Sequence, residues 1–116
     1  MVKPEYIFAL QPKIRWAGMI TRKGEILFSQ MRPGIPSLTD AEEDKLLLEL
    51  RLPLLLEMGE RPIRWSGLPE FAIISYEKFF ELYVAHGNDH LIVVTVDKSI
   101  EFQLLSEIAN RIKTLQ

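Results

Sequence analysis

The chain has 116 residues, of which 47% are hydrophobic and 26% charged, with a formal net charge of −2 and no cysteine. This length and composition predict a single folded domain spanning residues 1–116 and argue against disorder. The lack of cysteine excludes disulfides, thiolate catalysis and cysteine-based zinc sites. The slight negative charge argues against a nucleic-acid-binding protein, which usually presents a basic face.

The N-terminal region does not resemble a secretion signal, because the apolar run at residues 6–10 is too short and no small-residue cleavage site follows it. The leucine-rich stretch in the middle of the chain is interrupted by Glu49 and Arg51. It falls short of the ~20 apolar residues that a membrane-spanning helix needs. We therefore expect a cytoplasmic protein that does not insert into membranes.

The first third of the chain predicts a short helix followed by a β-hairpin. Pro4 suits the first turn of a helix, which we expect over residues 4–11. Residues 13–21 have the two-residue periodicity of a β-strand, which predicts that alternate side chains lie on opposite faces of the strand. Ile14, Trp16, Gly18 and Ile20 form one set. A turn at residues 22–25 and a second strand at residues 25–31 complete the hairpin.

A helix is predicted over residues 39–58, after a loop with two prolines and a glycine. Thr39 and Glu42 have the spacing of a capping box, in which each side chain bonds a backbone N–H of the first turn. Further acidic residues at positions 40, 43 and 44 suit the positive end of the helix dipole.

The last part of the chain predicts three strands and a helix. The stretches "FAIISY", "FFELYVA" and "LIVVTV" are separated by short turns and predict an antiparallel meander. A final amphipathic helix with one apolar stripe follows, capped by Asp97 or Ser99. The element order α-β-β-α-β-β-β-α predicts an α/β sandwich of the α+β kind, with a single five-stranded, mostly antiparallel sheet.

The helix predicted over residues 39–58 is apolar on both sides. Leu46, Leu47, Leu50, Leu54 and Met58 fall on one side of a helical wheel, and other leucines occupy the opposite side. Because a helix that is apolar all round is normally buried all round, we expect a partner chain to cover its outer side. Coverage by the terminal helices is the alternative, and a membrane-surface role is a weaker one. Whether Pro53 kinks the helix or ends it stays open.

Leucines alone would not hold two chains together. Burial of four leucines yields roughly 6–12 kcal/mol, against an association cost of about 4–15 kcal/mol. An edge strand that pairs with its counterpart would add contact, and residues 71–76 are rich in β-forming residues without charge. The predicted dimer interface therefore comprises Leu48, Leu52, Leu55, Leu56, Phe71, Ile73 and Ser75.

The order of elements, with the motifs "QPKIRWAG" (residues 11–18), "RKGEIL" (22–27) and "MRPG" (31–34), resembles the roadblock/dynein-light-chain superfamily. The likeness continues through residues 71–102, covers nearly the whole chain, and is nearest to uncharacterised small archaeal roadblock-like proteins. The resemblance implies a profilin- and longin-related fold and a dimer formed through the central helix and an edge strand. It also implies a scaffold or regulator of small Ras-like GTPases. Pro53 and the connection at residues 59–70 depart from the family pattern.

Side chains that could carry chemistry have plainer interpretations. Asp40, Glu43 and Asp44 share a helix face and could hold a cation, but the helix dipole accounts for them equally. The loop "MRPGIPS" before a helix could hold an anion, but four carboxylates in the first turns would repel phosphate.

A second group, His86, Asp89 and His90, surrounds a hairpin turn and could bind zinc. We expect these residues to be solvated, and we expect the same of Arg15, Arg22 and Lys23. The serines 29, 37 and 66 lack the context of a catalytic nucleophile.

The sequence therefore predicts a non-enzymatic interaction module without metal or cofactor, homodimeric or heterodimeric, and the resemblance implies that it regulates a small Ras-like GTPase. The alternative from another class is a profilin- or PAS-like domain that senses a small ligand. That alternative requires a concave apolar cavity, whereas inward positions such as Phe28, Phe71 and Ile73 are expected to be filled.

Overall fold

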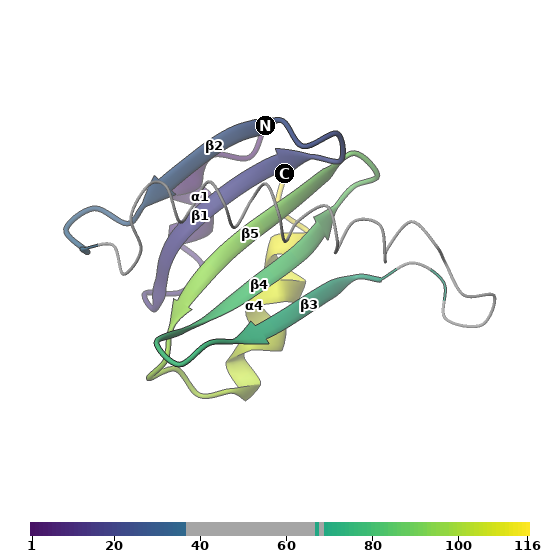
Figure 1. Cartoon of the computed structure of the whole chain (residues 1–116). Coiled ribbons are helices and arrows are strands. Elements are labelled where there is room, and N and C mark those ends of the chain that lie inside the picture. The colour runs from purple at the N-terminus through teal and green to yellow at the C-terminus, as the bar shows by residue number, and fades with distance from the viewer. Residues whose placement is uncertain (37–66, 68) are drawn as a thin grey trace.

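The computed structural model describes residues 1–36, 67 and 69–116. They form α1 (Pro4–Phe8), β1 (Ile14–Thr21), β2 (Ile26–Met31), β3 (Phe71–Ser75), β4 (Phe79–His86), β5 (His90–Asp97) and α4 (Gln103–Lys113). The strands build one sheet in the order β2-β1-β5-β4-β3, so that β2 and β3 are its edges (Figure 1). All four strand pairings are antiparallel, which confirms the predicted fold class. The helix predicted over residues 39–58 lies outside the described residues.

Helices α1 and α4 lie against the same face of the sheet (Figure 1). Helix α4 contributes a buried stripe at three- and four-residue spacing, as its sequence predicts. The stripe consists of Leu105, Ile108, Ala109 and Ile112. Ile7 and Phe8 of α1 join the same apolar cluster, which also contains alternate residues of β1, β4 and β5. The first core cluster thus lies between the two helices and the sheet.

The opposite face of the sheet carries a second apolar cluster. Trp16 and Ile20 of β1, Tyr83 of β4, and Leu91 and Val93 of β5 are all buried there. The central strands are therefore buried on both faces, and β5 accordingly contains an unbroken run of buried apolar residues at 91–94. Such a run is typical of a strand covered on both sides.

The alternation predicted for residues 13–21 fails at one position. Ile14 pairs with Val96 and Trp16 with Thr95, so Arg15 is an extra residue in the ladder. Because an extra residue reverses the alternation, Ile14 belongs to the first core cluster rather than to the face of Trp16. The regular alternation of residue types contains no sign of this bulge.

Both terminal helices are shorter than predicted. Helix α1 ends at Phe8, and its last turn tightens through a hydrogen bond from the Leu10 N–H to the Ile7 carbonyl. Pro12 disfavours helical conformation at Gln11, so the helix could not extend to the predicted end at residue 11. The predicted capping of the final helix by Asp97 or Ser99 is also wrong, since α4 begins at Gln103 with Phe102 as its N-cap residue.

Asp97 instead stabilises the turn that leads from β5 towards α4. Its Oδ1 accepts hydrogen bonds from the Ser99 backbone N–H (2.9 Å) and the Ser99 hydroxyl (2.7 Å). Its Oδ2 pairs with the Arg15 guanidinium at 3.2 Å. The two Ser99 hydrogen bonds, and then the charges of Arg15 and Lys13, lower the pKa of the Asp97 carboxyl.

This lowered pKa predicts a pH-dependent contribution to stability. A carboxyl whose folded pKa lies below its unfolded value stabilises the fold fully above the unfolded pKa, and that contribution disappears as the pH falls through the folded pKa. Asp97→Asn should therefore lower the free energy of unfolding at neutral pH. The difference from the unaltered chain should shrink towards zero in acid. Urea denaturation across a pH series would measure it, and a difference that persisted in acid would contradict an electrostatic origin.

Candidate interaction surface at the β3 edge

The outer edge of β3 presents backbone hydrogen-bonding groups away from the sheet. The Ala85 N–H donates to the Glu70 carbonyl, and the Tyr76 N–H donates to the Phe79 carbonyl. Antiparallel ladders alternate, so residues 70, 72, 74 and 76 direct their N–H and C=O groups at β4. Phe71, Ile73 and Ser75 consequently direct theirs outward. Among the described strands, β3 pairs with β4 alone.

The side chains of β3 are apolar or small. Phe71 and Ile73 pack against the first core cluster, on the face of α4, while Ala72 and Ile74 pack against the second cluster. These four side chains are only partly buried, and Ser75 is exposed. The residues predicted for the edge part of a dimer interface thus share one face of β3 and also carry its outward backbone groups.

The other edge of the sheet is different. Met19 of β1 pairs with Phe28 and the next residue, Ile20, pairs with Ile26, so Leu27 is an extra residue in β2. A bulge bends a strand and interrupts its hydrogen-bonding pattern, which is one way that proteins protect an edge against pairing. The strand β3 pairs with β4 without a register shift. The two edges therefore differ in their ability to accept another strand.

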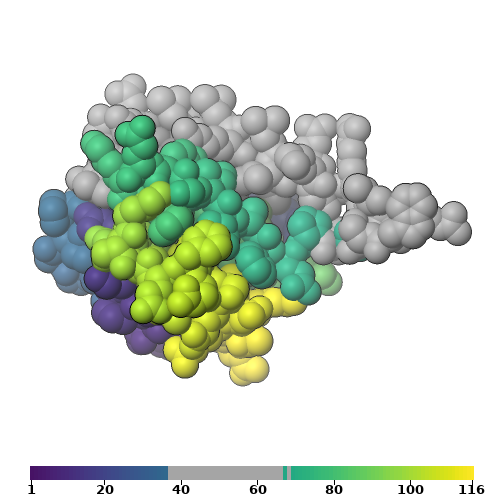
Figure 2. Space-filling model, turned by 90° about the horizontal axis from the view of Figure 1, so that it is seen from below, coloured from purple at the N-terminus to yellow at the C-terminus, as the bar shows by residue number. Residues whose placement is uncertain are grey.

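A lysine binds the C-terminal end of β3 to the loop before α4. The Lys98 ammonium donates to the Ser75 hydroxyl at 2.5 Å and to the Tyr76 carbonyl, and it lies 4.3 Å from the centroid of the Phe80 ring. Phe102 packs edge-on against Phe80, with 5.9 Å between ring centroids. In Figure 2 the lime-green atoms of this loop lie at the surface beside the teal atoms of β3 and the β3–β4 turn.

The other predicted interface residues, Leu48, Leu52, Leu55 and Leu56, lie outside the described residues. The same holds for the carboxylates at positions 40, 43 and 44, for Pro53, and for the serines at 37 and 66. Their predicted roles stay predictions of the sequence.

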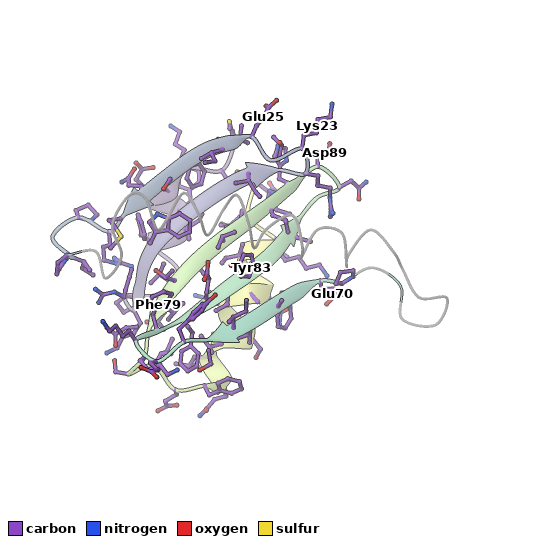
Figure 3. The ribbon with its side chains drawn as sticks, in the orientation of Figure 1. Lys23, Glu25, Glu70, Phe79, Tyr83 and Asp89 are labelled. Carbon is purple, nitrogen blue, oxygen red and sulfur yellow. The ribbon has the colours of Figure 1, made fainter. Side chains whose placement is uncertain are left out.

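Sequence reasoning missed a buried carboxylate on the face opposite α4. Glu81 of β4 is 3% exposed, and its Oε1 accepts a hydrogen bond of 2.8 Å from the Tyr83 hydroxyl. Figure 3 labels Tyr83 near the middle of the sheet. The sequence does contain an indication of this buried carboxylate, because Glu81 is the single charged residue in the apolar stretch "FFELYVA". A carboxylate in such a strand is rarely buried without a polar partner, which here is Tyr83.

The β4–β5 hairpin does not gather its histidines and aspartate into a site. His86 and His90 face each other across the ladder. The His86 Nε2 lies 2.6 Å from the Leu115 carbonyl, so this ring is partly buried against the C-terminal segment rather than solvated as predicted. Asp89 is exposed at the turn, near Lys23 of the neighbouring hairpin (Figure 3), and its carbonyl accepts a hydrogen bond from the Arg22 N–H. Within residues 1–36, 67 and 69–116, no group of three or more metal-binding side chains is close enough to hold an ion.

The prediction of solvated basic residues holds for Lys23 and not for Arg15. The Arg15 side chain is only 15% exposed, pairs with Asp97, and donates to the Pro36 carbonyl at 2.9 Å. Arg22 donates through Nε to the Asn88 carbonyl at 2.5 Å and so connects the two hairpin turns. Ser29 accepts a 3.0 Å hydrogen bond from the Trp16 indole, which gives it a structural role.

In the part of the chain that the structure describes, no helix has the length and apolar character needed to cross a membrane. No protein-family model matches the sequence, and no curated protein matches it either.

Solved structures do match the fold. The gliding protein MglB from Thermus thermophilus superposes with a TM-score of 0.70 at 14% sequence identity, covering 95% of this chain and 79% of that one. A structure described as MglB with a tetrameric arrangement gives the same values. A roadblock/LC7 domain from Streptomyces avermitilis superposes with a TM-score of 0.67 at 13% identity, covering 95% of this chain and 88% of that one. At such low identity the likeness establishes architecture, and the chain therefore has a roadblock/LC7-like fold.

Proposed function

We propose that this chain is a non-enzymatic protein-interaction module that forms a homodimer. Its interface would combine the outer edge of β3, through Phe71, Ile73 and Ser75, with the leucines at positions 48, 52, 55 and 56. Two copies of β3 would pair antiparallel and join two sheets into one. A cytoplasmic location and the absence of nucleic-acid and membrane partners stay predictions of the sequence.

The observation that carries the proposal is the contrast between the two edges of the sheet. Strand β3 is uncharged, lacks a bulge, and has partly buried apolar side chains on both faces. Proteins usually protect such an edge with charge, proline or a bulge, because it is a template for pairing. The bulged strand β2 has that protection and β3 does not.

The backbone hydrogen bonds of a β3 pair would be insufficient alone. Each contributes about 0.5–1.5 kcal/mol net, while association costs an estimated 4–15 kcal/mol before any gain. Apolar burial must supply the remainder, and the leucines predicted for the interface at positions 48, 52, 55 and 56 would be a suitable source. The β3 edge and these leucines would therefore act together.

Regulation of a small Ras-like GTPase is the cellular role that we propose for the dimer. It follows from the resemblance of the sequence to roadblock proteins and is supported by a fold like that of MglB. The structure described as MglB with a tetrameric arrangement is an assembly of several chains with this fold, which supports self-association. The matched structures named above do not test the archaeal likeness of the sequence, which stays a prediction.

The ligand-sensing alternative has less support. Phe28, Phe71 and Ile73, which would line a cavity between the sheet and its helices, pack against the first core cluster. A binding pocket needs concave volume together with converging polar groups. These positions instead contribute to a filled core.

Light scattering tests the proposed dimer, and affinity capture tests the proposed regulation of a GTPase. At micromolar concentration the protein should scatter as twice its chain mass of 13.5 kDa, and a monomer would contradict the dimer. Immobilised protein should capture a small GTPase from extract of its native cell in one nucleotide state, with GDP and a non-hydrolysable GTP analogue compared. If a dimer captured no GTPase in either state, the regulatory role would fall while the dimer stood.

A further inference from the structure

Phe102 is a large apolar side chain that its own chain leaves in solvent. It is 63% exposed at the start of α4, although its ring touches the ring of Phe80. The neighbouring apolar residue Ile100 is 8% exposed. An aromatic ring that remains exposed beside a candidate interface is a frequent anchor for a partner.

The position of Phe102 relates it to the β3 edge. Phe80 pairs with Ser75 across the β3–β4 ladder, so Phe102 and Phe80 lie on the α4 face beside the last residue of β3. Lys98 lies between them and the edge, bonded to Ser75 and stacked on Phe80. We name Ser75, Lys98 and Phe102 the β3 corner.

The outward residues of β3 favour one register for pairing with a second copy. If the two-fold axis passes at Ile73, then Ile73 faces its own counterpart and Phe71 faces Ser75, so that every outward residue has a partner. A register shifted towards the N-terminus would place Ser75 opposite Pro69, which has no N–H to donate. A shift towards the C-terminus would place Phe71 opposite Glu77, which lies beyond the strand.

We propose that Phe71 of a second copy docks on the β3 corner and thereby fixes this register. The inference rests on the proposed dimer. In the register centred on Ile73, Phe71 of the second copy is directly opposite Ser75, at the ~5 Å spacing of adjacent strands and on the same face as Phe102. Because Ser75 is small and exposed, the ring of the second copy's Phe71 would reach the Lys98 ammonium, which bonds the Ser75 hydroxyl, and the exposed ring of Phe102. Edge-to-face packing on Phe102 and a cation–π contact with Lys98 are the interactions expected.

Complementation between two variants tests the docking. Phe102→Ala and Phe71→Leu should each weaken the homodimer roughly 10- to 100-fold, because either change removes both copies of the aromatic contact. An equimolar mixture should form a heterodimer that is tighter than either variant homodimer, because one intact Phe71–Phe102 contact remains in it. Sedimentation velocity over a concentration series measures all three dissociation constants. Tyr6→Ala, which removes a 45% exposed ring on α1, is the matched control and should change none of them.

Cysteine substitution tests the register independently, because the natural chain contains no cysteine. Ile73→Cys should form an intermolecular disulfide on mild oxidation, whereas Ala72→Cys, which would face position 74, should not. This measurement also decides the question if Phe71→Leu fails to fold.

The possible outcomes separate the two proposals. If the natural chain is a dimer, any of three results would overturn the docking and leave the dimer standing. These are an unchanged dissociation constant for Phe102→Ala, a mixture of variants no tighter than the variant homodimers, and cross-linking through position 72. A monomeric natural chain would overturn both. Weakened variants, restored association in the mixture and cross-linking at position 73 would support the docking.

Discussion

Ile73→Pro is expected to dissociate the proposed dimer while leaving the protomer folded. The Ile73 N–H points away from β4, so proline at this position removes no hydrogen bond of the described sheet, and edge strands tolerate proline in that orientation. In the dimer, the same change removes one donor from each copy and leaves the opposing carbonyls without partners. The combined loss of about 3 kcal/mol corresponds to a dissociation constant at least ~100-fold weaker. Sedimentation velocity would measure it.

Two matched variants isolate the backbone contribution. Ile73→Ala removes the same side chain but keeps the N–H, so it should weaken the dimer much less than proline does. Ile74→Pro, by contrast, removes a donor that faces β4, and it should unfold the edge strand as judged by circular dichroism. If Ile73→Pro and Ile73→Ala associated equally well, β3 would not be the pairing edge.

The second large effect is expected at Gly18 of β1. A Cβ atom on Gly18 would lie 2.7 Å from Cζ2 of the Trp16 ring and closer still to Cη2. The ring has little freedom to move, because Trp16 is 9% exposed within the second apolar cluster and its Nε1 donates to Ser29. Gly18→Val should therefore lower the free energy of unfolding by about 3 kcal/mol. Urea denaturation monitored by circular dichroism would show the loss.

The direction of the change in the free energy of unfolding distinguishes Gly18 from an ordinary strand position. In an ordinary strand position, valine in place of glycine would raise stability by up to ~1 kcal/mol, because β-branched residues suit strands. A stabilised Gly18→Val variant would therefore show that the indole does not cover Gly18. Trp16→Leu should remove most of the conflict, so the double variant should lose less than the sum of the single losses.

The strands and their order along the chain could be predicted from the sequence alone. The alternation of side chains predicted the strands, and turn-forming residues predicted the connections between them. Gly24 and Gly87 lie in two of these turns and have positive φ angles of 93° and 65°. The edge position of β3 could also be predicted, because residues 71–75 begin the meander and end short of the charged turn.

The features that the sequence did not reveal depend on three-dimensional context. The bulge at Arg15 follows from pairing with β5, since the guanidinium reaches Asp97 on that strand. Asp97 caps a turn rather than a helix because Ser99, two residues later, supplies both donors. Glu81 is buried because its strand lies inside the sheet, next to β5. The sequence pattern puts Phe102 within a helical segment, and only the late start of α4 places it beside β3.

The unequal edges of the sheet also bear on how many copies can assemble. A chain with two pairing edges can add further chains at both ends and grow into a fibre, whereas a chain with one such edge is saturated after a single partner. In the proposed dimer the β3 edges would be used, and the bulge at Leu27 disfavours pairing of β2, so strand-to-strand growth would stop at two copies. Any larger complex would have to form through helices or sheet faces, and a high cellular concentration of the protein would not by itself convert it into filaments.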